Sequence, residues 1–273
     1  MNPDTQTIYI FTACVFALLM FLETLVPRQN SESELASRWI NNFSLSAVTW
    51  YASNLFATWA MIWFAGNVNL HQLRLVPQSV ASNPVAGFLL LLVVAEFIGY
   101  WGHRVYHRVS WLWPIHAVHH ADTRLDVSTS LRNHPLETLL TLPLITPAVV
   151  MLGVTPAVAA TYQLFVVAST AFGHANIRLP QALDRVLRRV IITPDYHRLH
   201  HSSEQRYTDS NFGTLVPWFD YLFGTAKWRD PRELENMEIG LEYWREKRDK
   251  RIDQLLVMPF RKIRRPAAAG ASQ

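Results

Sequence analysis

The chain has 273 residues, half of them hydrophobic and 12% aromatic, and its mean hydropathy is slightly positive. This composition is rich in apolar residues for a soluble domain and favours a membrane protein. Cys14 is the single cysteine, which excludes a disulfide framework and a thiolate metal site, so any metal must be bound through nitrogen and oxygen. The formal charge of +4 is concentrated in the last third, which favours a cytoplasmic surface near anionic lipid.

Five apolar stretches approach the length of a membrane-spanning helix: residues 7–27, 45–66, 85–101, 136–155 and 157–173. About 20 helical residues cross ~30 Å of hydrocarbon. The first stretch lacks a basic region before it and a cleavage site after it, so we expect a retained span rather than a signal peptide. The fourth and fifth are separated by little more than Thr155 and Pro156 and predict a helical hairpin, in which Pro143 and Pro147 should kink the first helix.

The chain is predicted to be an all-α, polytopic membrane protein with four to five transmembrane helices. We expect an N-terminal transmembrane region at 1–84, a catalytic domain at 85–226 and a basic cytoplasmic tail at 227–273. Within that tail, residues 231–263 mix aromatic and charged residues, which is typical of an interfacial amphipathic helix or an ordinary solvated helix. The distribution of Lys and Arg places the N-terminus outside and the histidine-rich segments and the C-terminus inside.

Eight of the eleven histidines lie in three clusters with helical spacing. They are His103 and His107; His116, His119 and His120; and His197, His200 and His201. Positions i, i+3 and i+4 of a helix share one face, so each cluster presents its imidazoles in one direction. Chance accounts for one such pair better than for three clusters. Imidazole suits zinc, copper, iron and nickel, so the spacing does not select the metal, but eight ligands exceed the four of one tetrahedral zinc and predict two metals.

Two common metal motifs are absent. The chain has no H-E-x-x-H, which weighs against a zinc protease of that class, and no E-x-x-H, which weighs against the carboxylate-bridged di-iron site of ferritin-like bundles. A histidine-rich, redox-active di-iron centre remains. Such a centre activates dioxygen and removes hydrogen from an unactivated C–H bond.

The motifs "AEFIGYWGHRVYH", "HAVHHADTRLDVSTSLRNHPLE", "GHANIRLP", "PDYHRLHHS" and "NFGTLVPWFDYLFGT" resemble the fatty acid hydroxylase and sterol desaturase superfamily over roughly residues 85–226. The resemblance implies a cytosolic helical cap that holds a histidine-rich dimetal site. It implies two irons ligated almost wholly by histidine, with the eight clustered histidines as ligands, and a lipid substrate that enters from the bilayer. It also implies His174 as a ligand. Where some fatty acid hydroxylases have another histidine four residues later, this chain has Arg178.

Five further residues are candidates for a metal ligand or for a group that supports a ligand. His134 is expected in one of these two roles, because one branch of the superfamily has this histidine and the other does without it. A ligating imidazole usually donates its second ring N–H to an acceptor. Glu96, about two helical turns before His103, is a candidate acceptor, and the others are Asp122, Asp195 and Asn211.

The sequence therefore predicts an oxidoreductase that hydroxylates or desaturates a lipid-like substrate with O2, the substrate being a sterol, a fatty acyl chain, an ether lipid or a carotenoid. It has no H-P-G-G haem-binding segment, no G-x-G-x-x-G and no cysteine set for an iron–sulfur centre, so electrons are expected from a separate cytochrome or ferredoxin type of donor. No nucleic-acid partner is expected. A zinc-dependent membrane hydrolase or transferase and a non-catalytic membrane scaffold are the alternatives.

Overall fold

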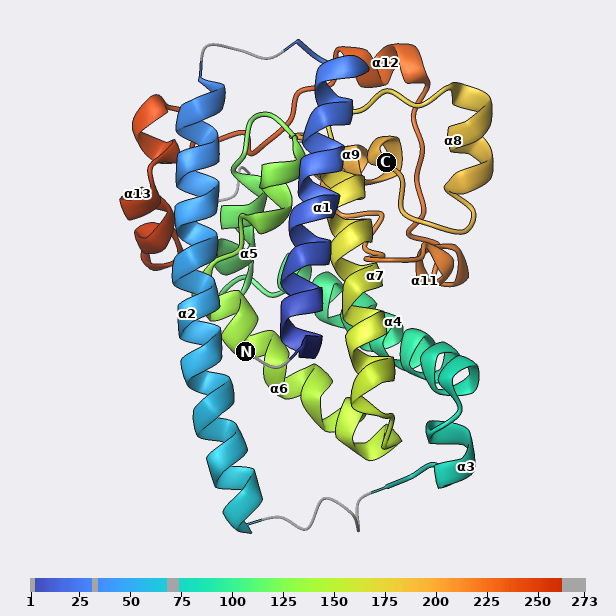
Figure 1. The fold of residues 1–273 in the computed structure, drawn as a ribbon. Coiled ribbons are helices and arrows are strands. Elements are labelled where there is room, and N and C mark those ends of the chain that lie inside the picture. Colours follow the sequence, from blue (N-terminus) through green and yellow to red (C-terminus); the bar gives the residue numbers. More distant parts are fainter. Residues whose placement is uncertain (1–2, 31–33, 68–73, 262–273) are drawn as a thin grey trace, which may run out of the picture.

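The computed structural model describes residues 3–30, 34–67 and 74–261, and over these residues it contains helices and no named strand, which confirms the all-α prediction. The long helices are α1 (Pro3–Leu25), α2 (Leu35–Asn67), α4 (Pro84–Arg108), α6 (Pro135–Leu152) and α7 (Pro156–His174). In Figure 1, α1 and α2 stand upright and extend upward beside the short helices, whereas α4 and α6 run obliquely through the lower part of the molecule.

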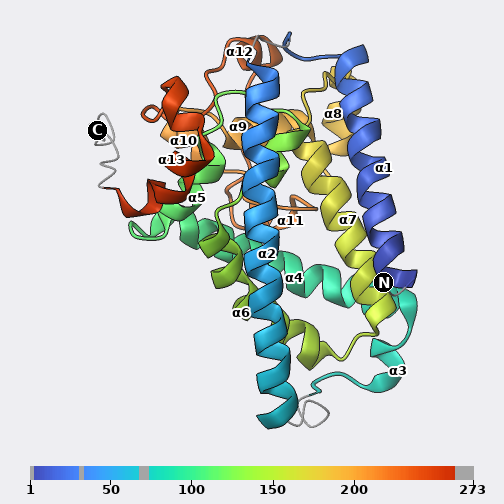
Figure 2. The ribbon, with the colours of Figure 1, turned by 60° about the vertical axis from the view of Figure 1, so that its left-hand side comes forward.

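The cap consists of short helices and 3₁₀ turns gathered at one end of the long helices (Figures 1 and 2). These elements are α5 (Trp113–His120), η2 (Val127–Leu131), α8 (Gln181–Leu187), α9 (Pro194–His200), α10 (Gln205–Thr208), α11 (Trp218–Leu222), α12 (Pro231–Glu235), η3 (Lys247–Lys250), α13 (Ile252–Val257) and η4 (Met258–Phe260); α3 (Gln78–Ala81) lies at the opposite end. The cap therefore lies at the end of the molecule opposite α3.

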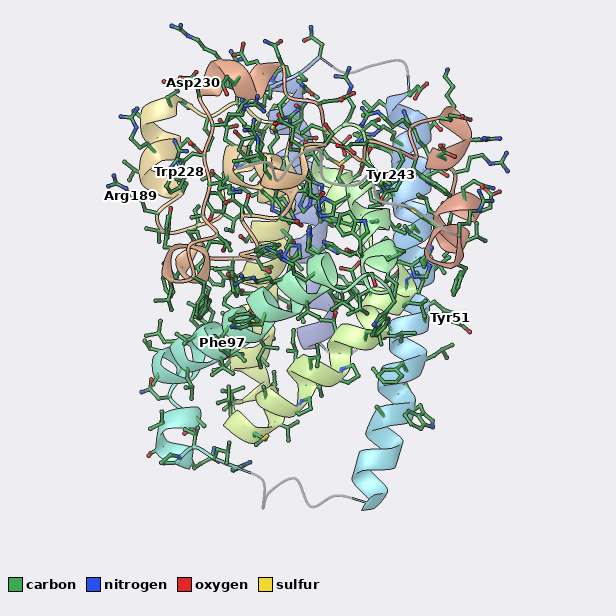
Figure 3. The ribbon with its side chains drawn as sticks, turned by 180° about the vertical axis from the view of Figure 1, so that it is seen from behind. Tyr51, Phe97, Arg189, Trp228, Asp230 and Tyr243 are labelled. Carbon is green, nitrogen blue, oxygen red and sulfur yellow. The ribbon has the colours of Figure 1, made fainter. Side chains whose placement is uncertain are left out.

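Four helices of the described chain are long and apolar enough to cross a membrane: Gln6–Leu25, Pro84–Arg108, Pro135–Leu152 and Pro156–His174. The stretch 45–66, which was predicted to be a span, lies within α2, which does not belong to this set although Trp50, Tyr51 and Trp59 on it are exposed (Tyr51 in Figure 3). The count therefore agrees with the expected four to five spans.

The predicted hairpin between α6 and α7 is present. Gly153 ends α6 with φ +65°, the left-handed conformation that glycine adopts at least cost, and the Thr155 side chain accepts the N–H of Val158 to start α7. Pro143 and Pro147 lie inside α6, which continues past both prolines as one helix from Pro135 to Leu152.

A buried ion-pair network fastens α2 to the cap. Arg38 donates from Nε and Nη2 to the two carboxylate oxygens of Asp122 at 2.9 and 3.0 Å, and its Nη1 lies 2.9 Å from Asp126 Oδ2. Asn42, one turn later, accepts Nη1 of Arg132 at 3.0 Å, and Arg132 Nε donates to Val118 O at 2.9 Å. The first turns of α2, the last turns of α5 and η2 thus form one buried polar unit.

The residues after 227 pack against this unit instead of forming one exposed helix. Leu241, Leu255 and Met258 join a core with Leu45 of α2 and Trp113 of α5, among others. The prediction of a single interfacial or solvated helix over 231–263 is wrong for the part that the structure describes, where short turns separated by irregular chain take its place. Gly240 (φ +95°) and Trp244 (φ +65°) adopt left-handed backbone conformations, which interrupt a continuous helix.

Removal of the Arg38 guanidinium leaves the Asp122 carboxylate buried without its main partner. We expect Arg38→Ala to lower the free energy of unfolding by about 3–5 kcal/mol. Arg251→Ala, at an exposed ion pair with Asp253, is the matched control and should cost less than about 1 kcal/mol. Thermal unfolding of both variants in the same detergent measures the difference, and equal midpoints would contradict the role given to Arg38.

Candidate metal centre

The clustered histidines and His174 lie at the ends of two long helices, α4 and α7, and on two short helices of the cap, α5 and α9. His103 and His107 lie in the last turns of α4, and His174 is the last residue of α7. The H-x-x-H-H of α5 begins three residues after the helix start, where Pro114 has no N–H to satisfy. The second H-x-x-H-H lies on α9, whose start is fixed by Pro194 and by the Thr193 side chain. Each motif is thus held on a helix whose start is locally determined.

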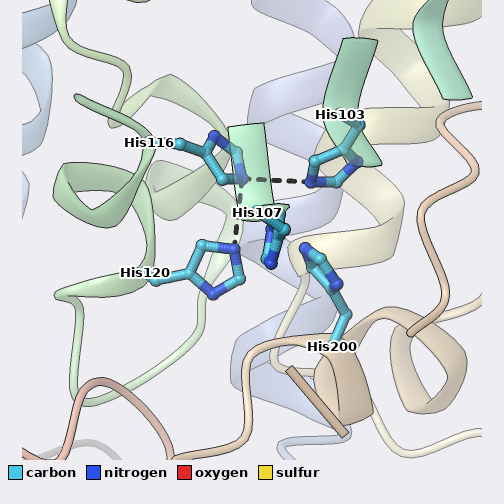
Figure 4. Close-up of side chains that lie close together, drawn as sticks. All are labelled: His103, His107, His116, His120 and His200. Atoms are coloured by element: carbon cyan, nitrogen blue, oxygen red, sulfur yellow. Dashed lines mark hydrogen bonds between the residues drawn. The ribbon is translucent and has the colours of Figure 1, made fainter. Parts of the chain in front are cut away.

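Nine imidazoles come together in two groups, within each of which the ligand atoms lie within 4.8 Å of one another. The first group is His103, His107, His116, His120 and His200, shown in Figure 4, and the second is His119, His174, His197 and His201. The spatial groups therefore cut across the clusters of the sequence.

Helical geometry explains why each H-x-x-H-H motif contributes histidines to both spatial groups. Successive residues of an α-helix differ by about 100° in direction, so the i and i+4 residues of H-x-x-H-H point close to one another and the i+3 residue points away to one side. In α5 the i and i+4 residues, His116 and His120, serve the first group and His119 serves the second. In α9 the assignment is reversed, with His197 and His201 in the second group and His200 in the first. Each helix thus contributes to both groups.

Five of these imidazoles have a fixed tautomer, because the Nδ1 atom of each lies beside an oxygen that only accepts. The pairs are His103 with Phe212 O (2.9 Å), His116 with Glu137 Oε1 (2.8 Å), His119 with Arg132 O (3.2 Å), His174 with Thr170 O (2.7 Å) and His200 with Ser210 O (2.6 Å). Nδ1 therefore carries the proton, and Nε2 presents a lone pair.

In two places these lone pairs face each other. Nε2 of His103 lies 3.0 Å from Nε2 of His116, and Nε2 of His174 lies 3.0 Å from Nε2 of His119. No proton is available between two such nitrogens, so the contact is repulsive unless a cation lies between them. Ring nitrogens that bind one metal at about 2.1 Å and at right angles are about 3 Å apart. The donor set therefore fits a metal ion in each group.

Protonation of the imidazoles is a poor substitute for a metal. Burial, reinforced by the neighbouring imidazoles, holds the pKa of His119, His120, His197 and His201 well below the ordinary histidine value, and it lowers the pKa of His200 to about 3. These rings are neutral at physiological pH. Nε2 of His200, a buried nitrogen without a hydrogen-bond partner among the described atoms, points into the first group.

Two carboxylates that sequence reasoning missed contact the first group. Glu137 accepts Nδ1 of His116, and Asp209 Oδ1 lies 3.3 Å from Nδ1 of His107. A carboxylate beside the second nitrogen fixes the ring and strengthens its basicity as a ligand. Glu137 carried a signal, because it is an acidic residue in the first turn of an otherwise apolar helix, three residues after His134. Asp209 lies in a loop and has no recognisable spacing.

His134 lies outside both groups. Its Nδ1 accepts the N–H of Leu136 at 3.1 Å and caps α6, and its Nε2 donates to Leu256 O at 3.2 Å. Both ring nitrogens are therefore used, and the imidazole joins the start of α6 to α13. This position is structural support for the helix that carries Glu137.

The four other candidate residues hold the framework around the histidines. Glu96 was expected to accept from His103, whose Nδ1 instead bonds Phe212 O; Glu96 accepts the N–H groups of Leu215 and Val216 and the Tyr162 hydroxyl. Glu96 thus fixes the loop that contains Phe212.

Asp122 is bound by Arg38, as described above, and Asp195 pairs with Arg28. Asn211 has φ +55° and donates to Tyr196 O at 2.9 Å, so it positions the start of the 211–216 loop against α9. Among the described residues, no carboxylate belongs to either histidine group.

A cavity of about 290 Å³ opens beside both groups, between α4, α6 and α7. His103, His116, His119, His174 and His197 border it at the cap end. Its other walls are mostly apolar or small, with hydroxyl and amide groups and the acidic Glu137 between them; they include Ile98, Gly99, Gly102, Tyr106, Ser130, Asn133, Glu137, Thr141, Leu144, Ile145, Ser169 and Thr170. The cavity therefore connects the candidate metal positions with helices apolar enough to lie in a bilayer.

Residues 88–225, which contain all nine grouped histidines, match the family described as fatty acid hydroxylase. The chain belongs to this family. As a family member with four apolar helices it is an integral membrane protein, and the resemblance inferred from the motifs is confirmed.

Three curated relatives show the range of the family. The chain is 32% identical over 157 residues to the ornithine lipid hydroxylase of Rhizobium tropici, 29% identical over 151 residues to the human alkylglycerol monooxygenase and 28% identical over 179 residues to a very-long-chain aldehyde decarbonylase of Oryza sativa. These alignments cover 56%, 54% and 61% of this chain and 45%, 31% and 27% of the relatives, so the chain spans less than half the length of each. No solved structure matches the chain.

The grouping predicts how metal content responds to substitution. His200→Ala should remove the metal of the first group and His174→Ala that of the second, because each loses an Nε2 donor. Metal per protein, measured by mass spectrometry of the purified holoprotein, should fall by about half in each variant or by more where one group supports the other. His134→Ala is the control and should keep the wild-type metal content. A loss in His134→Ala equal to that in His200→Ala would contradict the assignment of the two groups.

Proposed function

We propose that the chain is a membrane di-iron oxygenase that hydroxylates or desaturates a lipid-like substrate with O2 and electrons from a separate donor. The observation that carries the proposal is the pair of imidazole groups, with lone pairs turned inward, beside a cavity between apolar helices. Relatives named ornithine lipid hydroxylase and alkylglycerol monooxygenase support a lipid as substrate.

The nine grouped histidines would hold the two irons, His103, His107, His116, His120 and His200 on one side and His119, His174, His197 and His201 on the other. Irons bound there would supply activation of dioxygen and the oxidising power to break a C–H bond. In hydroxylation one oxygen atom enters the substrate and the other leaves as water, which consumes two electrons and two protons. The electrons are assigned to a cytochrome or ferredoxin type of donor.

The protein's own side chains bind and orient the substrate. The cavity is at the low end of small-molecule pockets, about 300–1,000 Å³, so it holds the reacting part of a lipid while the remainder lies between the helices. Leu144, Ile145 and Ile98 exclude water from the alkyl chain. Ser130 and Asn133 offer hydrogen bonds at the histidine end. Glu137 keeps the proton of His116 on Nδ1, which leaves Nε2 free to bind metal.

The direction of the helices supports a cytoplasmic position for the histidines and the C-terminus. The ends of α1, α2 and α7 at Leu25, Leu35 and His174 lie toward the cap, as do the end of α4 and the start of α6. We count α2 as a fifth crossing although it lies outside the set of four apolar helices, because it runs from the cap to the opposite end. Five crossings in this order would put every histidine group on one side, and the basic residues of that side fit the cytoplasm.

The experiment that tests the function uses membranes with and without the chain. Lipid mass spectrometry should show a gain of about sixteen mass units for oxygen insertion or a loss of about two for desaturation, and it should do so only with O2 and a reductant. Conversion at full rate without O2 and reductant would instead support a zinc-dependent hydrolase or transferase. Unchanged lipids under all conditions, with metal bound, would support a scaffold.

Two glycines on α4 shape the cavity and give a second prediction. A Cβ at Gly102 would meet no atom within 4 Å, and one at Gly99 would meet only Thr214 Oγ1 at 3.9 Å, so added side chains would fill cavity space without displacing the backbone. Gly102→Leu should therefore lower turnover by about 100-fold, as expected for a misplaced substrate, with wild-type metal content. Gly102→Ala should have a smaller effect. Wild-type turnover in Gly102→Leu would show that the substrate does not occupy this cavity.

A further inference from the structure

A basic pocket of about 450 Å³ lies on the flank of the cap, away from the histidines. Arg185, Arg188, Arg189 and Arg229 line it together with Tyr221, Trp228 and Asp230. Figure 3 shows Arg189, Trp228 and Asp230 on this flank, above Phe97 of α4. The oxygenase function leaves this pocket without a role.

The pocket has an excess of positive charge. Arg188 pairs with Asp184 at 3.0 Å, and Arg229 pairs with Glu204 and Glu233 at 2.5 and 2.8 Å. Asp230 is used at the start of α12, where its carboxylate accepts the N–H of Arg232. Among the described residues, Arg185 and Arg189 have no carboxylate within ion-pair distance, and both are exposed. Arg185 lies in the last turn of α8 and Arg189 in the turn that follows, and both line the pocket.

A series of aromatic contacts joins the pocket to α4, one of the helices apolar enough to cross a membrane. Tyr221 of α11 contacts the ring of Trp228 at 5.8 Å and donates to Arg188 O at 2.7 Å. Through α11 this contact reaches α4, because Phe219 lies 5.4 Å from Phe97 and Phe223 lies 5.2 Å from Trp101 between ring centroids.

Exposed apolar side chains accompany the arginines on this flank. Phe97 and Trp101 are exposed on α4, Leu222 on α11, and Val186 and Val190 on the chain that carries Arg185 and Arg189. Aromatic side chains that mark the end of a membrane helix lie at the level of the lipid headgroups. The arginines stand just above that level.

We propose that this pocket binds the phosphate of an anionic phospholipid from the leaflet on the cap's side. A guanidinium group matches phosphate geometry with two parallel N–H donors, and Trp228 stacks with Arg188 at 5.6 Å, which holds that side chain in place. Val186, Val190 and Leu222 provide exposed apolar surface beside the pocket, which the acyl chains of the bound lipid would cover. A lipid satisfies both the charge and the apolar surface, whereas an acidic protein would satisfy the charge alone.

The test uses the full-length holoprotein in nanodiscs of phosphatidylcholine that contain spin-labelled phosphatidylglycerol or spin-labelled phosphatidylcholine. The test variant is the double substitution Arg185→Gln and Arg189→Gln. The control is Arg248→Gln with Arg251→Gln, which removes the same charge at exposed residues of the tail that already have carboxylate partners. Metal content of each variant verifies the fold.

Wild type and the control should immobilise phosphatidylglycerol in preference to phosphatidylcholine, and the test variant should lose that preference by about fivefold per arginine. High salt should weaken the preference only partly, because the phosphate lies in a pocket. An unchanged preference in the test variant would overturn the proposal.

Two further results would also overturn it. Inorganic phosphate that binds in pure phosphatidylcholine nanodiscs, with no preference for phosphatidylglycerol, would identify a site for free anions. Loss of electron transfer from an acidic donor protein, with the lipid preference intact, would identify a protein-docking surface. Because the readout is lipid association, failure of the proposed oxygenase function would leave this result unaffected.

Discussion

The arrangement of the two histidine groups depends on imidazole lone pairs that point at common positions. These lone pairs repel one another unless a cation lies between them. Nε2 atoms 3.0 Å apart, each with its proton fixed on the opposite side of the ring, cost free energy in the absence of a cation and bind one strongly in its presence. Metal bound at these points would therefore be coupled to folding of the cap. The acceptors that impose this arrangement come from separate segments: Phe212, Ser210, Arg132, Thr170 and Glu137.

The surrounding framework keeps these acceptors in place. Arg132 donates to Val118 O and Asn42 Oδ1, and its own carbonyl accepts from His119. The buried polar network that begins at α2 is therefore joined directly to one of the grouped imidazoles. Glu96 does the same on the other side, since it binds the backbone of the loop that contains Phe212. Buried charged groups are tolerated here because each has several hydrogen-bonding partners. Through these bonds they fix the rings of the grouped histidines and the loop beside them.

Much of the site could be predicted from spacing, because H-x-x-H-H on a helix fixes which side chains share a face. The eight clustered histidines were found in this way, whereas His174 stands alone in the sequence and was found only through the resemblance to a family. The division into two groups could not be predicted, because it depends on how α5 and α9 are rotated against each other. His134 was given a role through the resemblance to the superfamily and Glu96 through its distance from His103 along the helix. The structure shows their hydrogen bonds directed to the backbone of Leu256, Leu215 and Val216.

The fold followed the same division between local and long-range information. Apolar stretches and the hairpin at Gly153 were evident, because length, composition and turn chemistry act locally. The arrangement of residues 228–261 was not, since Leu241, Leu255 and Met258 become buried only through contact with α2 and α5. Glu137 gave a weak signal and Asp209 none, because a carboxylate that binds a histidine 102 residues away leaves no periodicity.

The reversed use of H-x-x-H-H in α5 and α9 makes the two groups interdependent. Rotation of α5 that withdrew His116 and His120 from the first group would also move His119 in the second, and α9 imposes the same constraint through His200 and through His197 and His201. A metal bound in one group would therefore help to fix the rings of the other. The cavity borders rings of both groups, His103 and His116 from the first and His119, His174 and His197 from the second, so a substrate carbon held there would lie beside both. In the proposed oxygenase, the sharing of α5 and α9 between the two groups would thus link the spacing of the metals to the position of the substrate.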